Sequence, residues 1–396
     1  MIFFLLIVSG ECYLIESVNF SRQSDQVNSF SISELDDESE STFMLNDNYP
    51  VFFKCSFELY NQTFEIVFRR TNLRQPDNIQ RSLFFYYESD HVHVNGTSKY
   101  QAHGILFKRP NQTQTATRSF DIVATLLELE DSVLVSLLDI RLVTDLNATN
   151  KYRAFKSLPT LTADDKEKYK RVVTEPMNVK KLNLFVEACV HVEYSVFRRV
   201  QAFFGNENAD FVRIYLASYF ASKVSGVNKI FQSFEHPRFK IDVVLSDLVI
   251  HESFDATNNI QLNASSARDL FARATPFKRD YLPREIKVDQ SDLVFYIHAN
   301  QFAEATLGLA YLRDVCQPGL LTSLILNVKN EPLELVMAHE LAHSKYSQFC
   351  FYFPIWIHRG DQSKDPHLNP IMMFGRNLNQ TIRKIQTKFR IRTEQY

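Results

Sequence analysis

The sequence predicts an α/β (α+β) protein in which a mostly β domain precedes a domain with a mixed sheet and a late helix. Residues 51–143 divide into short runs of alternating polar and apolar residues, such as "VFFKCSFELY" and "SFDIVATLLEL", with turn residues between them. Runs of this length and period are typical of β-strands. From about residue 181 onward, strand-like runs alternate with helix-like runs, which is the pattern of a sheet with helices packed on it.

The elements after residue 181 are expected in a definite order. Strands are expected in "KLNLFVEACVHVEY", "FKIDVVLSDLVIHES" and "SDLVFYIHAN", and a short helix in "SSARDLFARAT". Between the first two strands, "NADFVRIYLASYFASKVSGVNKIFQSF" predicts a long helix with Asn208 as its N-cap. Its apolar residues recur at helical spacing; they are Leu216, Phe220, Val224, Val227 and Phe231. An extended segment follows at "ATLGLAYLRDV", and a last helix begins at "NEPLELVM", where Pro332 is tolerated in the first turn.

The bulk composition limits the class of protein. A length of 396 residues suggests two or three domains, and 45% hydrophobic residues are enough for packed cores. The 44 basic and 46 acidic residues nearly cancel, so no nucleic-acid partner is indicated. No segment approaches 18 uninterrupted apolar residues, and no transmembrane anchor is therefore expected.

The composition along the chain predicts five segments. We expect a signal peptide at 1–10, an acidic mobile lead-in at 11–50, the β-rich domain at 51–143, a polar linker at 144–180 and the second domain at 181–396. The lead-in is rich in Ser, Asp, Glu and Asn, a composition that buries little apolar surface.

Two features favour a secreted protein. The apolar run Ile2–Val8 is followed by Ser9 and Gly10, which is typical of a signal peptide; the alternative is a buried first strand. N-glycosylation sequons are also more frequent than the roughly two that ordinary composition would give. They lie at Asn19, Asn61, Asn95, Asn111, Asn147, Asn263 and Asn379.

The motif "HELAH" is the main indication of chemistry. His339 and His343 are four residues apart on a helix, so both imidazoles can bind one Zn²⁺ ion, and Glu340 lies beside the metal as a general base. Such a zinc ion activates a water for attack on a carbonyl carbon. The alternative is an ordinary helix with surface histidines.

Several motifs together resemble the catalytic domain of the adamalysin/reprolysin (ADAM-type) zinc metalloproteases, which belong to the metzincins. They are "LGLAYLRDVCQPG", "VMAHELAH" and "NPIMMF", in this order along the chain. The resemblance implies a Met-turn at Met372 or Met373 under the zinc site. It also implies that the segment at Leu307, Gly308 and Leu309 is an edge strand along which an extended peptide substrate pairs.

The resemblance also assigns a role to the first half of the chain. It implies that the β-rich domain is a propeptide that inhibits the enzyme and is removed at the basic cluster "KYKR", which ends at Arg171. A solvated basic turn is the alternative for this cluster. Cys55 could then be an inhibitory thiolate, or a buried strand cysteine. Cys316 matches a family disulfide cysteine, with Cys350 or Cys189 as the nearby partners.

The sequence departs from the family after His343. The family extends the motif with a glycine and a third histidine, and Tyr346 and Phe349 hold these positions here. We hypothesise that residues 345–357 are an insertion that displaces the third ligand to His358, with His367 as the second choice and Asp361 or Asp365 as the third. An artefact of the gene model is the alternative for this segment.

The sequence therefore predicts a secreted zinc metalloendopeptidase that is made as a zymogen and cleaves proteins or peptides. The alternative of another class is a secreted pseudo-protease that has lost activity and acts by binding a protein. A third interpretation is an intracellular protein with an accidental motif.

Overall fold

The computed structural model describes most of the chain before residue 342. The described residues are 2–8, 11–18, 20–34, 49–71, 84–95, 97–108, 120–130, 133–144, 150–159, 182–205, 208–233, 239–254, 269, 291–299, 308–309, 321–325, 333–338 and 340–341.

The first half of the chain forms one antiparallel sheet of nine strands, here called the N-terminal sheet, in the order β3-β11-β10-β9-β8-β7-β6-β5-β4. Its strands are β3 (Phe20–Gln26), β4 (Asn28–Glu34), β5 (Phe52–Leu59), β6 (Gln62–Arg70), β7 (Phe84–Val94), β8 (Thr97–Lys108), β9 (Phe120–Glu130), β10 (Val133–Thr144) and β11 (Asn150–Pro159). Consecutive strands pair as hairpins from β4 to β11, in agreement with the alternating pattern of residues 51–143.

The N-terminal sheet curls until its two edges meet. Its edge strands β3 and β4 are joined by the single residue Val27, so one end of each edge must lie close to the other. Phe30 of β4 stacks on Tyr152 of β11 at 3.8 Å and on Phe57 of β5 at 6.2 Å between ring centroids. The inside of the curl holds a hydrophobic core that includes Phe57 and Ile66.

The N-terminal sheet includes strands outside residues 51–143, the segment for which a β-rich domain was expected. Strands β3 and β4 lie in the expected lead-in 11–50, and β11 lies in the expected linker 144–180. For these strands the expectation of a mobile lead-in at 11–50 and of a linker beginning at residue 144 was wrong. β3 and β4 are the edge strands, where polar residues are common because one side has no pairing partner.

The chain begins with a separate hairpin. β1 (Ile2–Val8) pairs with β2 (Glu11–Val18) in an antiparallel sheet of two strands. The apolar run Ile2–Val8 is thus a strand; whether it is buried is not described, and signal cleavage near Gly10 stays a prediction.

The second half forms a mixed sheet of five strands, here called the C-terminal sheet, in the order β13-β12-β14-β16-β15. All neighbours are parallel except β15, which is antiparallel to β16 and lies at the edge. Its strands are β12 (Leu182–Val192), β13 (Phe239–Ile250), β14 (Leu293–His298), β15 (Gly308–Leu309) and β16 (Leu321–Ile325). Strand β16 was not predicted, although the mixed sheet was.

Among the described residues, two complete helices precede β13. α2 (Tyr194–Phe203) was not predicted, whereas α3 (Ala209–Ser233) matches the expected long helix. Oδ1 of Asn208 accepts a hydrogen bond from the backbone N–H of Asp210 at 2.9 Å, which confirms the N-cap. Residues 333–338 and 340–341 are helical and are here called the late helix. Of the helix expected at 265–275 only Asp269, which is helical, is described.

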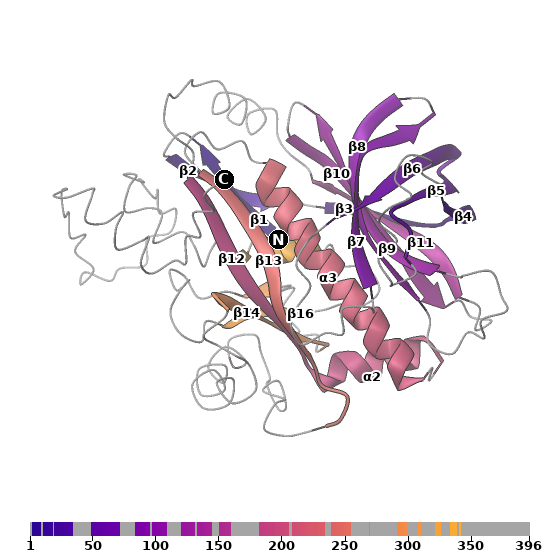
Figure 1. Ribbon diagram of the computed structural model, residues 1–396. Coiled ribbons are helices and arrows are strands. Elements are labelled where there is room, and N and C mark those ends of the chain that lie inside the picture. Colours follow the sequence, from indigo (N-terminus) through magenta and orange to yellow (C-terminus); the bar gives the residue numbers. More distant parts are fainter. Residues whose placement is uncertain are drawn as a thin grey trace, which may run out of the picture.

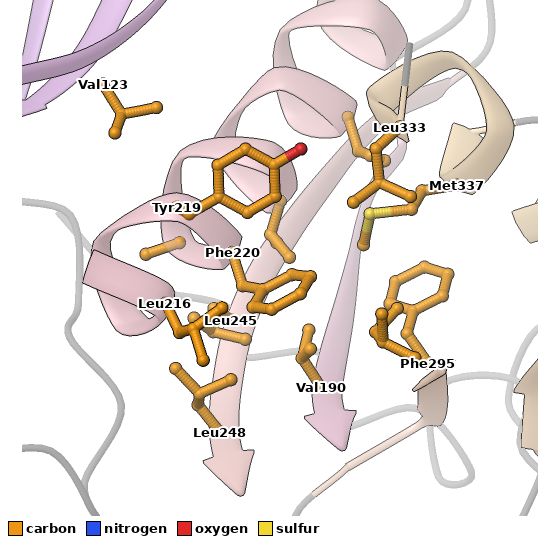
Figure 2. Close-up of a cluster of buried hydrophobic side chains, with 14 of the residues drawn as sticks. Val123, Val190, Leu216, Tyr219, Phe220, Leu245, Leu248, Phe295, Leu333 and Met337 are labelled. Atoms are coloured by element: carbon orange, nitrogen blue, oxygen red, sulfur yellow. The ribbon is translucent and has the colours of Figure 1, made fainter. Parts of the chain in front are cut away.

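Helix α3 lies between the two sheets (Figure 1). Most of its residues from Ile214 to Asn228 are buried, because one side covers the C-terminal sheet and the other covers the N-terminal sheet. Figure 2 shows Leu216 and Phe220 of α3 beside strands of the C-terminal sheet, with Met337 of the late helix close by. No helix among the described residues is long and apolar enough to cross a membrane.

Candidate active site

The late helix places Glu340 against the edge of the C-terminal sheet. A Cβ atom on Gly308 of β15 would lie 2.7 Å from Oε1 of Glu340 and 2.8 Å from Cγ1 of Val336. These distances are shorter than real Cβ contacts, so any larger residue at position 308 requires Glu340 and Val336 to shift. Val336 and Glu340 are four residues apart and share one side of the helix. That side of the late helix therefore faces the edge strand.

Burial changes the acidity of Glu340. Its side chain is 5% exposed, and desolvation raises the pKa of its carboxyl to about 8. The same helix is anchored by Leu333, Leu335 and Leu341, which are fully buried in the core that includes α3. The late helix that carries the Glu340 carboxyl group is thus packed against the hydrophobic core through these three leucines.

Most of the predicted site residues lie outside the described residues. The structure describes Glu340, Gly308 and Leu309 and leaves out the predicted zinc ligands, the Met-turn, the processing site and Leu307. Those left out are His339, His343, His358, His367, Asp361, Asp365, Met372, Met373, Arg171 and Leu307. Among the described residues, no group of three or more His, Cys, Asp or Glu side chains is placed to bind a metal ion.

Two of the sequons lie in described turns. Asn61 follows Tyr60 in the two-residue turn between β5 and β6, and both have positive φ, of 57° and 52°, as a type I′ turn requires. Asn95 follows β7 and is also exposed. Both positions could accept a glycan, which stays a prediction. The side chains of Asn19, Asn111, Asn147, Asn263 and Asn379 are not described.

Two of the cysteines, Cys55 and Cys189, are free, buried thiols. Cys55 is 2% exposed and packs in the core inside the curled N-terminal sheet, and burial raises the pKa of its thiol to about 12. An inhibitory thiolate at Cys55 was therefore wrong, and the alternative of a buried strand cysteine is confirmed. Cys189 of β12 is also a free, buried cysteine.

A cluster of buried charges, here called the Lys223 cluster, joins the late helix to α3 and the N-terminal sheet. Nζ of Lys223 on α3 lies 2.5 Å from Oε1 of Glu334 on the late helix and 2.8 Å from Oδ1 of Asp139 on β10. The hydroxyl of Thr125 on β9 donates to Oε1 of Glu334 at 2.8 Å. Burial opposes the charge of Lys223, but the two carboxylates outweigh it and raise the pKa of Lys223.

Gly226 lets the late helix approach α3 beside this cluster. A Cβ atom on Gly226 would lie 2.6 Å from Cγ of Glu334 and 3.1 Å from Nε2 of His103 on β8. His103 is 1% exposed, and burial, followed by the charges of Lys229 and Lys223, lowers its pKa to about 3. The His103 side chain is thus uncharged at neutral pH. It lies where β8, α3 and the late helix come together.

A second set of buried polar residues lies at the ends of strands β12 and β14. The hydroxyl of Tyr296 donates to Oε1 of Glu193, and the hydroxyl of Ser195 donates to Oε2 of Glu193 at 2.7 Å. Nε2 of His191 lies 2.8 Å from Nε2 of His251. Burial, and then the nearby His251, lowers the pKa of His191. The contacts of Glu193 tie β14 to the start of α2, and the contact between His191 and His251 joins β12 to the residue after β13.

Sequence reasoning did not find the Lys223 cluster. The available signal was the presence of charged residues inside strongly apolar runs, namely Asp139 and Arg141 in "LLDIRLV" and Lys223 in "YFASKVSGV". A charge in such a position must be paired when the segment is buried. The partners could not be named, because Thr125 and Glu334 are 209 residues apart in the sequence.

Comparison with known proteins identifies one family. Residues 217–347 match the sequence model of the family described as metallo-peptidase family M12B, reprolysin-like. The matched region begins in α3, includes β13 to β16 and the late helix, and spans about a third of the chain. It contains His339, Glu340 and His343 and ends before His358. No curated protein matches the chain.

Proposed function

We propose that this chain, which carries a reprolysin-like segment of metallopeptidase family M12B, is a secreted, zinc-dependent endopeptidase made as a zymogen. Its substrates would be proteins or peptides. The family match supports the class of reaction, and the sequons and the apolar first segment support secretion.

The contact between Gly308 and Glu340 carries the proposal. It brings a buried carboxyl group to within touching distance of the edge strand β15. A peptide that pairs with this edge through main-chain hydrogen bonds would present its backbone beside Glu340. A general base must lie within reach of the proton that it removes, and Glu340 meets this requirement for a water close to such a peptide.

The residues around Glu340 suit a zinc ion. Two histidines four positions apart in the sequence, His339 and His343, match the donor set that zinc prefers, and His358 is the proposed third ligand. A bound zinc ion would polarise the peptide carbonyl and make a nearby water more acidic. The positive charge of the zinc would also lower the pKa of the Glu340 carboxyl, which burial alone raises to about 8. Glu340 would then accept the proton of that water and transfer it to the leaving amine, and Gly308 and Leu309 would align the substrate.

The proposed zymogen state places the N-terminal half as an inhibitor of this site, with processing after Arg171. The basic residues Lys168 to Arg171 suit a protease that reads Arg and Lys. The glycan-dependent mass of the protein after secretory expression tests the route of export.

Zinc content of the purified full-length protein, processed or unprocessed, tests the enzymatic proposal. About one zinc ion per chain and chelator-sensitive cleavage of a denatured protein substrate are expected. Glu340→Ala should abolish cleavage and keep the zinc, because Glu340 is not a ligand. His358→Ala should lose zinc, and retained zinc in this variant would transfer the third-ligand assignment to His367, Asp361 or Asp365.

A second candidate function is a pseudo-protease that acts by binding a protein. Tyr346 and Phe349 occupy the positions of the family's glycine and third histidine, and two histidines alone bind zinc weakly. A folded, secreted protein without zinc and without cleavage would favour this function over the enzyme.

A further inference from the structure

The N-terminal sheet and α3 share one continuous hydrophobic core. Side chains of β7, β8 and β9 alternate between the inside of the curl and the side that faces α3. The residues on the α3 side are each at most 5% exposed; they include Phe84, Tyr86, Ile105, Phe107, Val123 and Leu127. Phe107 meets Tyr215 of α3 edge-on, with 6.4 Å between ring centroids. The contact is therefore apolar and closely packed, as in an obligate interface.

Charges from both halves of the chain neutralise each other inside this interface. Lys223 of α3 lies between Asp139 of the N-terminal sheet and Glu334 of the late helix. Nη1 of Arg141 on β10 donates to the hydroxyl of Tyr219 on α3 at 3.1 Å. If either half left, Lys223 would lose one of its two carboxylates and Arg141 would lose this acceptor.

A partly exposed ion pair extends the same interface. Nζ of Lys229 on α3 lies 2.7 Å from Oε2 of Glu88 on β7. The attachment of the sheet to α3 thus runs from Tyr215 to Lys229, along most of the helix. Figure 1 shows α3 running beside the N-terminal sheet.

We propose that the N-terminal sheet stays bound to α3 when the segment between the two halves is cut, so that processing after Arg171 alone would not release it. Its role would be to hold Glu334, and with it the start of the late helix, through Lys223, Asp139 and Thr125. Removal of the N-terminal half would expose an apolar face and take Asp139 away from Lys223. The inference goes beyond the proposed function, because it does not depend on peptidase activity.

The test uses the full-length protein with a recognition sequence for a sequence-specific protease in place of residues 168–171. After complete cleavage, the two fragments should elute together in size-exclusion chromatography at the volume of the uncut protein. They should also remain together at about 1 M salt, because buried charges are screened little and apolar contacts are not weakened. Two separately eluting, folded fragments at physiological salt would overturn the proposal.

Two matched variants locate the attachment at the buried cluster. Asp139→Asn removes the carboxylate that the sheet supplies to Lys223 and keeps the side-chain volume. It should weaken association of the cut halves by about 10-fold or more, since it leaves a buried charge short of a partner. Glu65→Gln removes half of the Lys54–Glu65 pair, which is 34% and 46% exposed, and should change association by less than about two-fold. Equal effects of the two variants would overturn the assignment to Lys223.

The result is independent of the peptidase assignment. Association of the halves is measured without substrate, and it can be repeated with a chelator present. Cut halves that stay together in a protein without zinc would support this inference and contradict the enzymatic proposal, so the two can fail separately.

Discussion

Gly308 and Glu340 touch across the boundary between the edge strand and the late helix. The position that a Cβ atom on Gly308 would take lies 2.7 Å from Oε1 of Glu340. Any larger residue at 308 must push the carboxyl group away, and the late helix resists this movement because Leu333 and Leu335 are fully buried. The edge strand thus fixes the position of the proposed general base.

Gly308→Ala should therefore lower activity more than it lowers stability. Overpacking of this kind costs about 1–3 kcal/mol of unfolding free energy, whereas displacement of a general base lowers kcat by about 10²-fold. Unfolding in urea and kcat on one peptide substrate measure the two effects. Gly205→Asn is the control, because Gly205 has a φ of 70° with no atom near its Cβ position, and Asn tolerates this conformation. Unchanged kcat in Gly308→Ala would contradict a role for Glu340 near β15.

Gly226→Ala should destabilise the protein although alanine is the better helix former. The gain in helix propensity is about 1 kcal/mol. The new methyl group would lie 2.6 Å from Cγ of Glu334, whose carboxylate is held by Lys223 and Thr125. We expect a net loss of about 1–2 kcal/mol of unfolding free energy in urea. A more stable variant would show that the late helix does not approach α3 at this point.

The buried His103 should make the protein sensitive to acid. Burial lowers its pKa from 6.5 to about 3, so below pH 6.5 the unfolded chain binds a proton that the folded chain does not. Stability attributable to this group is complete above about pH 6.5 and falls as the pH drops toward 3, by about 2 kcal/mol at pH 5. His298, which is also buried, has the same direction and value.

His103→Gln should reduce this slope of unfolding free energy against pH between 6.5 and 4. Urea unfolding at several pH values measures it. His93→Gln is the matched control, since His93 is exposed on neighbouring strand β7. An unchanged slope in His103→Gln would mean that His103 is protonated in the folded protein.

Cys55 should not react with thiol reagents in the folded protein. It is 2% exposed, and burial raises its pKa to about 12, so neither access nor the thiolate form favours reaction. Labelling with iodoacetamide followed by mass spectrometry should find Cys55 unmodified in buffer and modified in urea. Modification in buffer at the same rate as in urea would contradict its burial in the sheet.

The sequence predicted those elements whose hydrophobic period is regular. The alternation in 51–143 predicted the central strands, and the spacing of Leu216, Phe220 and Val224 predicted α3. Strands β3 and β4 were missed because "FSRQSDQ" and "NSFSISE" carry the polar residues of edge strands, which resemble a disordered segment in composition. β3 can pair with β11 while β4 pairs with β5 only because the sheet curls. This long-range arrangement cannot be predicted from a local sequence pattern.

The site was predictable where local spacing defines it. The helix that carries Glu340 and the extended segment at Gly308 were both expected, but the contact between them depends on how the sheet and the helix pack. The Lys223 cluster was missed for a related reason. Lys223 and Glu334 are 111 residues apart, and the acidic partner of a buried lysine has no sequence signature.

The burial of β9 and β10 on both faces has a consequence for hydrogen exchange. These strands are central in the N-terminal sheet, with Leu126 and Leu138 on one side and Val123 and Leu137 on the other. Their amide hydrogens can exchange with solvent only when α3 separates from the sheet or the whole sheet opens. Deuterium uptake there should therefore be the slowest in the described part of the chain. Its rate should report the global unfolding free energy.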